Sequence, residues 1–155
     1  MNHAITRVQD ALLKRGFTCV IKEFSESTRT ANDAAVAIGC EVGQIVKSLL
    51  FRTTDSQQAL LILVSGKNRV NEGVIEALVK QKIVKADADF TREMTGFAIG
   101  GIPPLDNDKI SNVFIDQDLQ LFETVWAAAG TPFAVFSLKS TDLQKITHGR
   151  VVAIK

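Results

Sequence analysis

The sequence contains few of the side chains that most often perform catalysis. Its 155 residues include two histidines, two cysteines and no tyrosine. His3 and His148 have no suitable nucleophile beside them in the sequence, so solvent-facing positions are expected for both. Cys19 and Cys40 have neither metal-site spacing nor a catalytic signature, which predicts reduced thiols in a cytoplasmic protein. Catalysis by histidine, by cysteine or by a bound metal is therefore not expected.

Long apolar runs and the common nucleotide-binding and serine-hydrolase motifs are missing as well. No G-x-x-x-x-G-K-[ST], G-x-G-x-x-G or G-x-S-x-G pattern occurs. The longest apolar run, residues 59–64, has the length of a strand, and the N-terminus lacks the apolar segment of a secretory signal. We expect one domain over residues 1–155, without a membrane contact, a metal or a cofactor.

Charge of one sign does not accumulate either. The net charge is +1, and the lysines are dispersed. A mild basic bias in the middle third comes from Lys67, Arg69, Lys80, Lys82 and Lys85. A protein that follows a long stretch of nucleic acid would carry a stronger basic face. If nucleic acid is the partner, the contact should be short, such as one end of a strand.

Apolar periodicity and turn residues predict an α+β fold with a single mixed, mostly antiparallel sheet of about seven strands, flanked by about five helices. Strands are expected at residues 17–24, 43–51, 59–64, 112–115, 124–128, 133–138 and 151–154, with a brief one at 83–85. Helices are expected at residues 2–15, 30–39, 71–79, 90–95 and 141–146, with one helical turn at 117–122. Thr30, with Asp33, resembles a capping box, and Asn71 and Ser140 are expected to cap later helices.

Lys47 stands out within the strand expected at residues 43–51. Alternation places it on the same face as Ile45, Leu49 and Phe51. Lysine is rarely buried without a partner, so an inward lysine suggests a functional role. The alternative is an edge strand whose lysine reaches water along its aliphatic stem. The strand alone does not decide between the two.

Several segments together resemble the YbaK/ProX family of aminoacyl-tRNA deacylases, which are related to the editing domain of bacterial prolyl-tRNA synthetases. The resemblance spans nearly the whole chain. It rests on these segments: Ile45-Val-Lys-Ser-Leu-Leu-Phe51, Leu63-Val-Ser-Gly66, Thr95-Gly-Phe97, Gly100-Gly-Ile-Pro-Pro104, Ala129-Gly130 and Ser140-Thr-Asp-Leu143. It implies the α+β fold and hydrolysis of the ester that joins a wrong amino acid to tRNA, often tRNA(Pro).

The same resemblance implies a site without histidine, serine nucleophile or metal. Lys47 and Gly101 would be catalytic, and the enzyme would use groups of the substrate itself. The residues implied to bind substrate are Phe24, Thr30, Ser48, Gly100, Ile102, Pro103, Ala128 and Gly130. Independently, a charged donor in a partly desolvated cleft can hold a phosphate or a carbonyl, and glycines allow close approach of backbone N–H groups.

Three positions depart from relatives of known preference. Ser48 stands where cysteine-directed members typically have threonine and alanine-directed members asparagine. Phe24 and Ala128 stand where some cysteine-directed members have tyrosine and serine. The mischarged amino acid therefore stays open.

The expected partners are the acceptor end of an aminoacyl-tRNA and, by family analogy, prolyl-tRNA synthetase. Two other functions remain open at this point. One is a non-catalytic module that binds tRNA ends or a synthetase, and the other is a hydrolase of small amino-acid esters.

Overall fold

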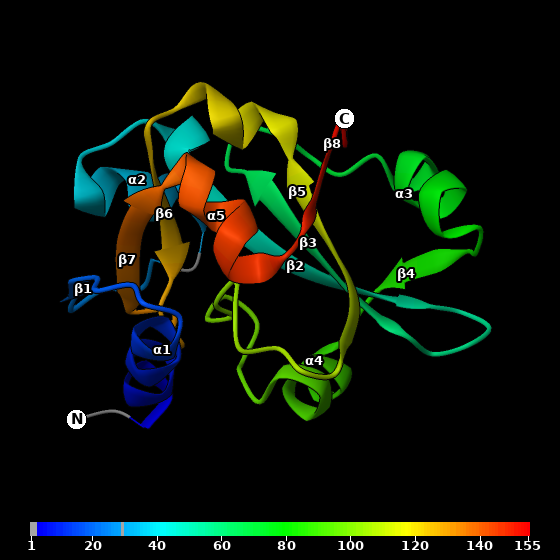
Figure 1. Cartoon of the computed structure of the whole chain (residues 1–155), viewed down its shortest axis with the longest axis horizontal. Coiled ribbons are helices and arrows are strands. Elements are labelled where there is room, and N and C mark those ends of the chain that lie inside the picture. Colours follow the sequence, from blue (N-terminus) through cyan, green and yellow to red (C-terminus); the bar gives the residue numbers. More distant parts are fainter. Residues whose placement is uncertain (1–2, 29) are drawn as a thin grey trace.

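Two adjacent, largely buried strands form the centre of the sheet (Figure 1). The computed structural model describes residues 3–28 and 30–155. β2 (Ile45–Thr53) and β3 (Ala59–Ser65) pair in antiparallel register, with Lys47 opposite Val64. Every residue of β3 is buried, because strands flank it on both edges and side chains cover both faces. The hairpin expected from the two apolar runs is confirmed.

The remaining strands extend this pair in both directions. They are β1 (Ile21–Glu23), β4 (Ile83–Lys85), β5 (Ile110–Asp116), β6 (Thr124–Ala128), β7 (Ala134–Lys139) and β8 (Arg150–Val152). The order is β1-β7-β6-β2-β3-β5-β8, and β4 pairs with β2 outside this path. β6 pairs with β2, β5 with β3 and β8 with β5 in parallel, whereas the other pairs are antiparallel. The mixed, mostly antiparallel sheet is confirmed, with eight strands among the described residues.

Helices cover both faces of the sheet. They are α1 (His3–Lys14), α2 (Ala31–Ile38), α3 (Glu72–Val79), α4 (Ala88–Thr95) and α5 (Ser140–Thr147), with short 3-10 segments η1 (Val42–Gln44) and η2 (Gln117–Leu121). The largest apolar cluster joins α1, α5 and the loop after α4 to one face. Two smaller clusters lie on the opposite face, one under α3 and one under α2. No helix among the described residues has the length and apolarity that a membrane crossing needs.

Several local expectations are corrected. The strand expected from residue 43 begins at Ile45, because η1 precedes it, and the strand expected over 17–24 is only β1. Asn71 is the N-cap residue of α3 as expected, but its side chain forms no cap bond. Ser140 instead donates to the Phe122 oxygen at 2.5 Å and is the first residue of α5. The start of the first helix expected at residue 2 lies outside the described residues.

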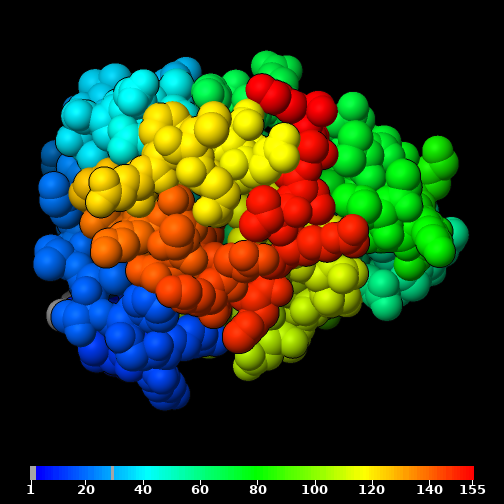
Figure 2. All heavy atoms as spheres, turned by 45° about the horizontal axis from the view of Figure 1, so that its top comes forward, coloured from blue at the N-terminus to red at the C-terminus, as the bar shows by residue number. Residues whose placement is uncertain are grey.

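Thr30 and the last residues of the chain behave as local chemistry suggests. The Thr30 hydroxyl accepts from the Asp33 N–H at 3.1 Å, which confirms it as the N-cap of α2. At the other end, β8 lies along β5, and the Asn71 N–H donates to the Ile154 oxygen. Figure 2 shows the C-terminal segment (red) between residues near 115–120 (yellow) and the region of α3 (green). Asp116 and Asp118 lie beside this C-terminal segment, since Asp116 pairs with Val152 and Asp118 lies 3.0 Å from Lys155 Nζ.

Candidate functional site

One edge of β2 is only partly covered by neighbouring strands. β6 pairs with β2 at Ile45 and Val46, and β4 pairs with it at residues 51–53. Between these two pairings, residues 47–49 have no strand partner on this edge of the described sheet. We call this stretch the edge gap. The edge gap interrupts the sheet at Lys47, the lysine for which the strand pattern suggested a functional role.

Backbone groups face the edge gap. Antiparallel pairing directs the N–H and C=O groups of alternate residues to alternate edges of a strand. The Ile45 oxygen accepts from the Gly66 N–H on the β3 side, whereas the Leu50 oxygen accepts from the Ala86 N–H on the β4 side. The N–H and C=O of Ser48 therefore face the β4 side, where the register of the described strands gives them no partner. A ligand in the gap could bond to them as an additional strand would.

A cleft of about 550 Å³ surrounds the edge gap. Both faces of β2 contribute to it, with Lys47 and Leu49 on one side and Val46 and Ser48 on the other. Further lining residues come from the start of α2, the loop after β3, the end of β4, the loop after α4, and β6 and β7. Of the residues predicted to form the site, the cleft brings together Thr30, Lys47, Ser48, Gly100, Ile102 and Ala128.

Lys47 lies on the face of β2 that alternation predicts, and the two smaller apolar clusters explain why it is tolerated there. Ile45 packs in the cluster under α2 and Phe51 in the cluster under α3, so Lys47 falls in the space between the two. It is half-buried, and its Nζ donates to the Asn68 main-chain oxygen at 2.5 Å. The ammonium therefore has a main-chain oxygen as its partner.

The surroundings of Lys47 are cationic. Burial lowers the pKa of Lys47, and the nearby charges of Arg69 and Lys85 lower it further, while Asp116 acts in the opposite direction. Lys67 lines the same cleft, and none of the described lining residues is an aspartate or a glutamate. An environment that disfavours another positive charge favours a bound anion. Three of the basic residues noted in the middle third of the sequence, Lys67, Arg69 and Lys85, thus lie at one cleft. Their spacing along the chain does not predict this.

The opposite side of the cleft is small and apolar. Val46, Ile102, Ala127 and Val135 line it. The Ser48 hydroxyl is buried there and has no hydrogen-bond partner among the described residues. A buried polar atom without a partner is costly, so a ligand group that bonds to this hydroxyl would remove the cost. The cleft thus combines a cationic part with a small apolar part that contains one free hydroxyl.

The two glycines of the loop after α4 have different roles. Gly100 lines the cleft and has φ 90°, a conformation that favours glycine. Gly101 does not line the cleft, and its φ lies outside the left-handed region. A Cβ on Gly101 would lie 2.8 Å from Thr131 Cα and 2.9 Å from the Gly130 oxygen. Gly101 therefore allows close packing of two loops, and its catalytic role stays a prediction.

Three more predicted residues lie outside the cleft lining. Gly130 has φ 98°, and a Cβ there would lie 2.7 Å from the Ala4 oxygen, so Gly130 faces α1. The Phe24 N–H donates to the Phe133 oxygen, which holds the chain beside the turn before β7. The Pro103 oxygen accepts from Asn107 Nδ2 at 3.1 Å. In this structure Gly130, Phe24 and Pro103 support the surrounding loops.

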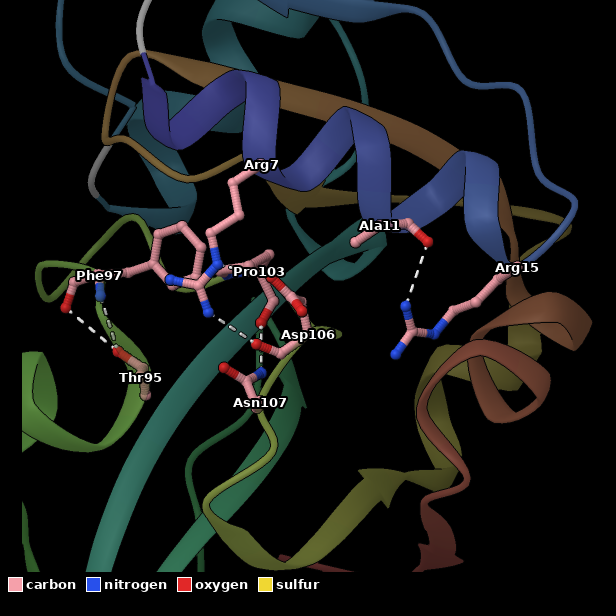
Figure 3. Close-up of polar contacts among 8 residues, drawn as sticks. All are labelled: Arg7, Ala11, Arg15, Thr95, Phe97, Pro103, Asp106 and Asn107. Carbon is pink, nitrogen blue, oxygen red and sulfur yellow. Dashed lines mark hydrogen bonds and ion pairs between the residues drawn. The ribbon is translucent and has the colours of Figure 1, made fainter.

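Arg7 of α1 contacts the loop after α4 (Figure 3). Its Nε lies 2.6 Å from Asp106 Oδ2, and its Nη2 donates to the Asp106 main-chain oxygen at 3.0 Å. The guanidinium also lies over the Phe97 ring, 4.3 Å from its centroid. Phe97 and Asp106 flank the segment that contains Gly100 and Ile102, so Arg7 constrains both ends of it.

Within residues 3–28 and 30–155, no three His, Cys, Asp or Glu side chains are grouped as metal ligands.

Comparisons with known proteins agree with this architecture. The family model of the aminoacyl-tRNA editing domain matches residues 25–146. A crystal structure of a proposed trans-editing enzyme for prolyl tRNA synthetase is 44% identical, with a TM-score of 0.93 over 100% of this chain and 98% of that one. The uncharacterized protein YwhH of Bacillus subtilis (strain 168) is 28% identical over 131 residues, which cover 84% of this chain and 83% of YwhH.

A proline–tRNA ligase of Lactobacillus helveticus (strain DPC 4571) is also similar, with 31% identity over 88 residues. These cover 56% of this chain and 15% of the ligase, so the likeness concerns one small part of a much larger protein. The family match includes the edge gap, the cationic residues and the loop after α4. The chain belongs to the aminoacyl-tRNA editing domain family.

Proposed function

We propose that this protein is an aminoacyl-tRNA deacylase, which hydrolyses the ester of a mischarged tRNA in the cytoplasm. The cleft at Lys47 carries the proposal, because it places a cationic part beside a small apolar part. The 3′ end of an aminoacyl-tRNA has matching chemistry, with phosphates next to an aminoacyl group. Family membership supports the same reaction class.

Cations would bind the RNA backbone. Lys67, Arg69 and Lys85 line the cleft, and no aspartate or glutamate is among its described lining residues. A contact with about three phosphates fits a protein of net charge +1, because a longer contact would need a larger basic surface. The acceptor end would then be the whole of the recognised RNA.

Lys47 would hold the last phosphate or the aminoacyl carbonyl. A charged donor in a partly desolvated cleft makes a strong hydrogen bond, and negative charge that develops on the carbonyl oxygen is stabilised by it. The N–H of Ser48 in the edge gap is a second donor aimed into the same space. An aminoacyl ester carries its own amine and a vicinal hydroxyl, so a bound water needs orientation more than a strong protein base.

The apolar part would limit the size of the amino acid. Val46, Ala127, Ala128 and Ile102 leave room for a small side chain, and the free Ser48 hydroxyl favours one with a hydrogen-bonding group. The candidates on tRNA(Pro) are cysteine, serine and threonine, which carry such a group, and alanine, which fits by its size alone. The similarities to a proposed trans-editing enzyme and to a proline–tRNA ligase support tRNA(Pro) and a synthetase partner.

A deacylation panel tests the proposal. Purified protein is incubated with Cys-, Ala-, Ser- and Thr-tRNA(Pro), with correctly charged Pro-tRNA(Pro), and with the simple methyl esters of the same amino acids. We expect rapid loss of at least one wrong amino acid and little loss of proline. Binding of the tRNAs without turnover would favour the non-catalytic module. Equal cleavage of the simple esters would favour a hydrolase that does not need RNA.

A further inference from the structure

The position of the Lys47 ammonium depends on one main-chain oxygen. Lys47 Nζ donates to the Asn68 oxygen, and among the described residues no carboxylate lies within ion-pair distance of it. Asn68 lies in the loop that follows β3, where its N–H donates to the Ser65 oxygen at 2.9 Å. A loop residue has more freedom than a strand residue, so something must fix this oxygen if the ammonium is to be held in one place.

The Asn68 side chain supplies that restraint. It is 8% exposed, and its Nδ2 donates at 2.8 Å both to Asp116 Oδ2 and to Asp118 Oδ2. An amide nitrogen has two hydrogens, and both are used. We call Asn68, Asp116 and Asp118 the Asn68 clamp. Aspartate at position 68 would face two carboxylates, and alanine would reach neither.

Asp116 is the buried anchor of this clamp. It is 1% exposed, at the end of β5. Its Oδ2 also accepts from the Ser65 N–H at 3.0 Å, and its Oδ1 accepts from the Asp118 N–H at 2.9 Å. A buried carboxylate is tolerated when N–H donors satisfy it, as here. The Asn68 hydrogen bond, together with Lys155 at 3.0 Å from Asp118 Oδ2, holds the Asp118 pKa below its ordinary value.

We infer that Asn68 is a positioning residue, whose clamp by Asp116 and Asp118 sets where the Lys47 ammonium lies in the cleft. The inference rests on the proposed function as far as catalysis is concerned. Its structural part does not depend on that function, because the hydrogen bonds exist without substrate. The clamp also brings a buried negative charge toward a lysine that is otherwise surrounded by cations.

The charged groups that act on Lys47 allow a direct test of this arrangement. They are Arg69 from the same loop as Asn68, Lys85 from β4, and Asp116 from β5, while Lys67 also lines the cleft. Loss of the Asn68 clamp weakens the hydrogen bond to the ammonium, and loss of the Asp116 charge removes the one attractive charge in this set. Both changes should make the protonated lysine less favourable, so both should lower the pKa of Lys47.

The experiment compares Asn68→Ala, Asp116→Asn and Asp118→Asn with the unchanged protein. The Lys47 side chain is titrated by NMR in lysine-labelled protein, with its signal assigned by its loss in Lys47→Arg. Gln144→Ala is the matched control, because it removes a side-chain amide bond to a main-chain oxygen, that of Gly149, away from the cleft. We expect the Lys47 pKa to fall by about 0.5 or more in Asn68→Ala and Asp116→Asn, and to be unchanged in Gln144→Ala.

Deacylation is measured in the same folded variants. We expect a loss on the order of tenfold to a hundredfold for Asn68→Ala, without a matching loss of folded protein. An unchanged Lys47 pKa in every folded variant would overturn the inference, whatever the activity. If Asn68→Ala fails to fold, Asp116→Asn and Asp118→Asn decide. If the unchanged protein deacylates no tRNA, the proposed function fails, and the titration still decides whether the clamp positions Lys47.

Discussion

Gly101 packs against the main chain of Gly130, although neither glycine lines the cleft. A Cβ on Gly101 would lie 2.9 Å from the Gly130 oxygen and 2.8 Å from Thr131 Cα, closer than real Cβ contacts. Both neighbours are main-chain atoms, which cannot rotate away as a flexible side chain can. The loop that carries Gly100 is thus seated on the turn between β6 and β7.

The first prediction follows from this contact. Gly101→Ala should lower the free energy of unfolding by about 1–3 kcal/mol, because overpacking forces the backbone to shift. Activity should fall with it, since the shift moves Gly100 and Ile102 at the cleft. Urea denaturation and single-turnover deacylation measure the two effects. A variant with the stability of the unchanged protein would show that the two loops are not seated as described.

A second prediction concerns Arg7. Arg7→Ala should lower the free energy of unfolding by only about 1 kcal/mol, because half-exposed ion pairs and cation–π contacts are weak. KM should rise more than kcat falls, since the loop beside the substrate loses its restraint. Arg15→Ala is the control, because the described side-chain bond of Arg15 goes to the Ala11 oxygen of α1 and not to the loop after α4. Equal kinetic effects of the two substitutions would contradict the role assigned to Arg7.

The third prediction is the dependence of stability on pH. The pKa of Lys47 is lowered in the folded protein, so between this pKa and the ordinary lysine value the unfolded chain binds more protons. The free energy of unfolding should therefore rise with pH across that window, relative to Lys47→Met. Lys47 is half-exposed, so the effect is modest. Urea denaturation from pH 7 to 10.5 measures the free energy of unfolding of both proteins. A difference between them that does not change with pH would contradict the account.

A fourth prediction concerns the RNA contact. Arg69→Ala, Lys67→Ala and Lys85→Ala should each weaken tRNA binding and reduce the slope of log K against log[salt] by about 1. The unchanged protein should show a slope that corresponds to roughly two to four phosphates. Lys139→Ala, with the same loss of charge on an exposed residue at the far end of β7, is the control. A steep slope, or a need for the anticodon arm, would indicate a wider RNA surface.

Local patterns in the sequence predict much of the fold. The alternation from Ile45 to Phe51 places Lys47 on the correct face, and Thr30 caps α2 as its spacing with Asp33 suggests. Such features depend on neighbours along the chain. Asn71 occupies the predicted N-cap position of α3 but forms no side-chain cap bond. The cap expected at Ser140 is wrong, because local spacing does not reveal a competing partner such as the Phe122 oxygen.

The candidate site is less predictable, because it depends on contacts between distant segments. Asn68 is about fifty residues from Asp116, and no spacing rule connects them. The sequence also does not show which of two adjacent glycines adopts a positive φ, and the structure assigns that conformation to Gly100. The roles of Lys47, Ser48 and the other lining residues stay predictions until activity is measured.

The most direct test is single-turnover deacylation of the mischarged tRNA(Pro) panel by Lys47→Met. Lys139→Met is the control, because it removes the same charge from an exposed lysine outside the cleft. Lys47→Met keeps an apolar stem of similar length and removes only the ammonium. We predict a loss of deacylation on the order of 10² or more, with an unfolding midpoint close to that of the unchanged protein, and full activity in Lys139→Met. Turnover by a folded Lys47→Met close to that of the unchanged protein would contradict the account.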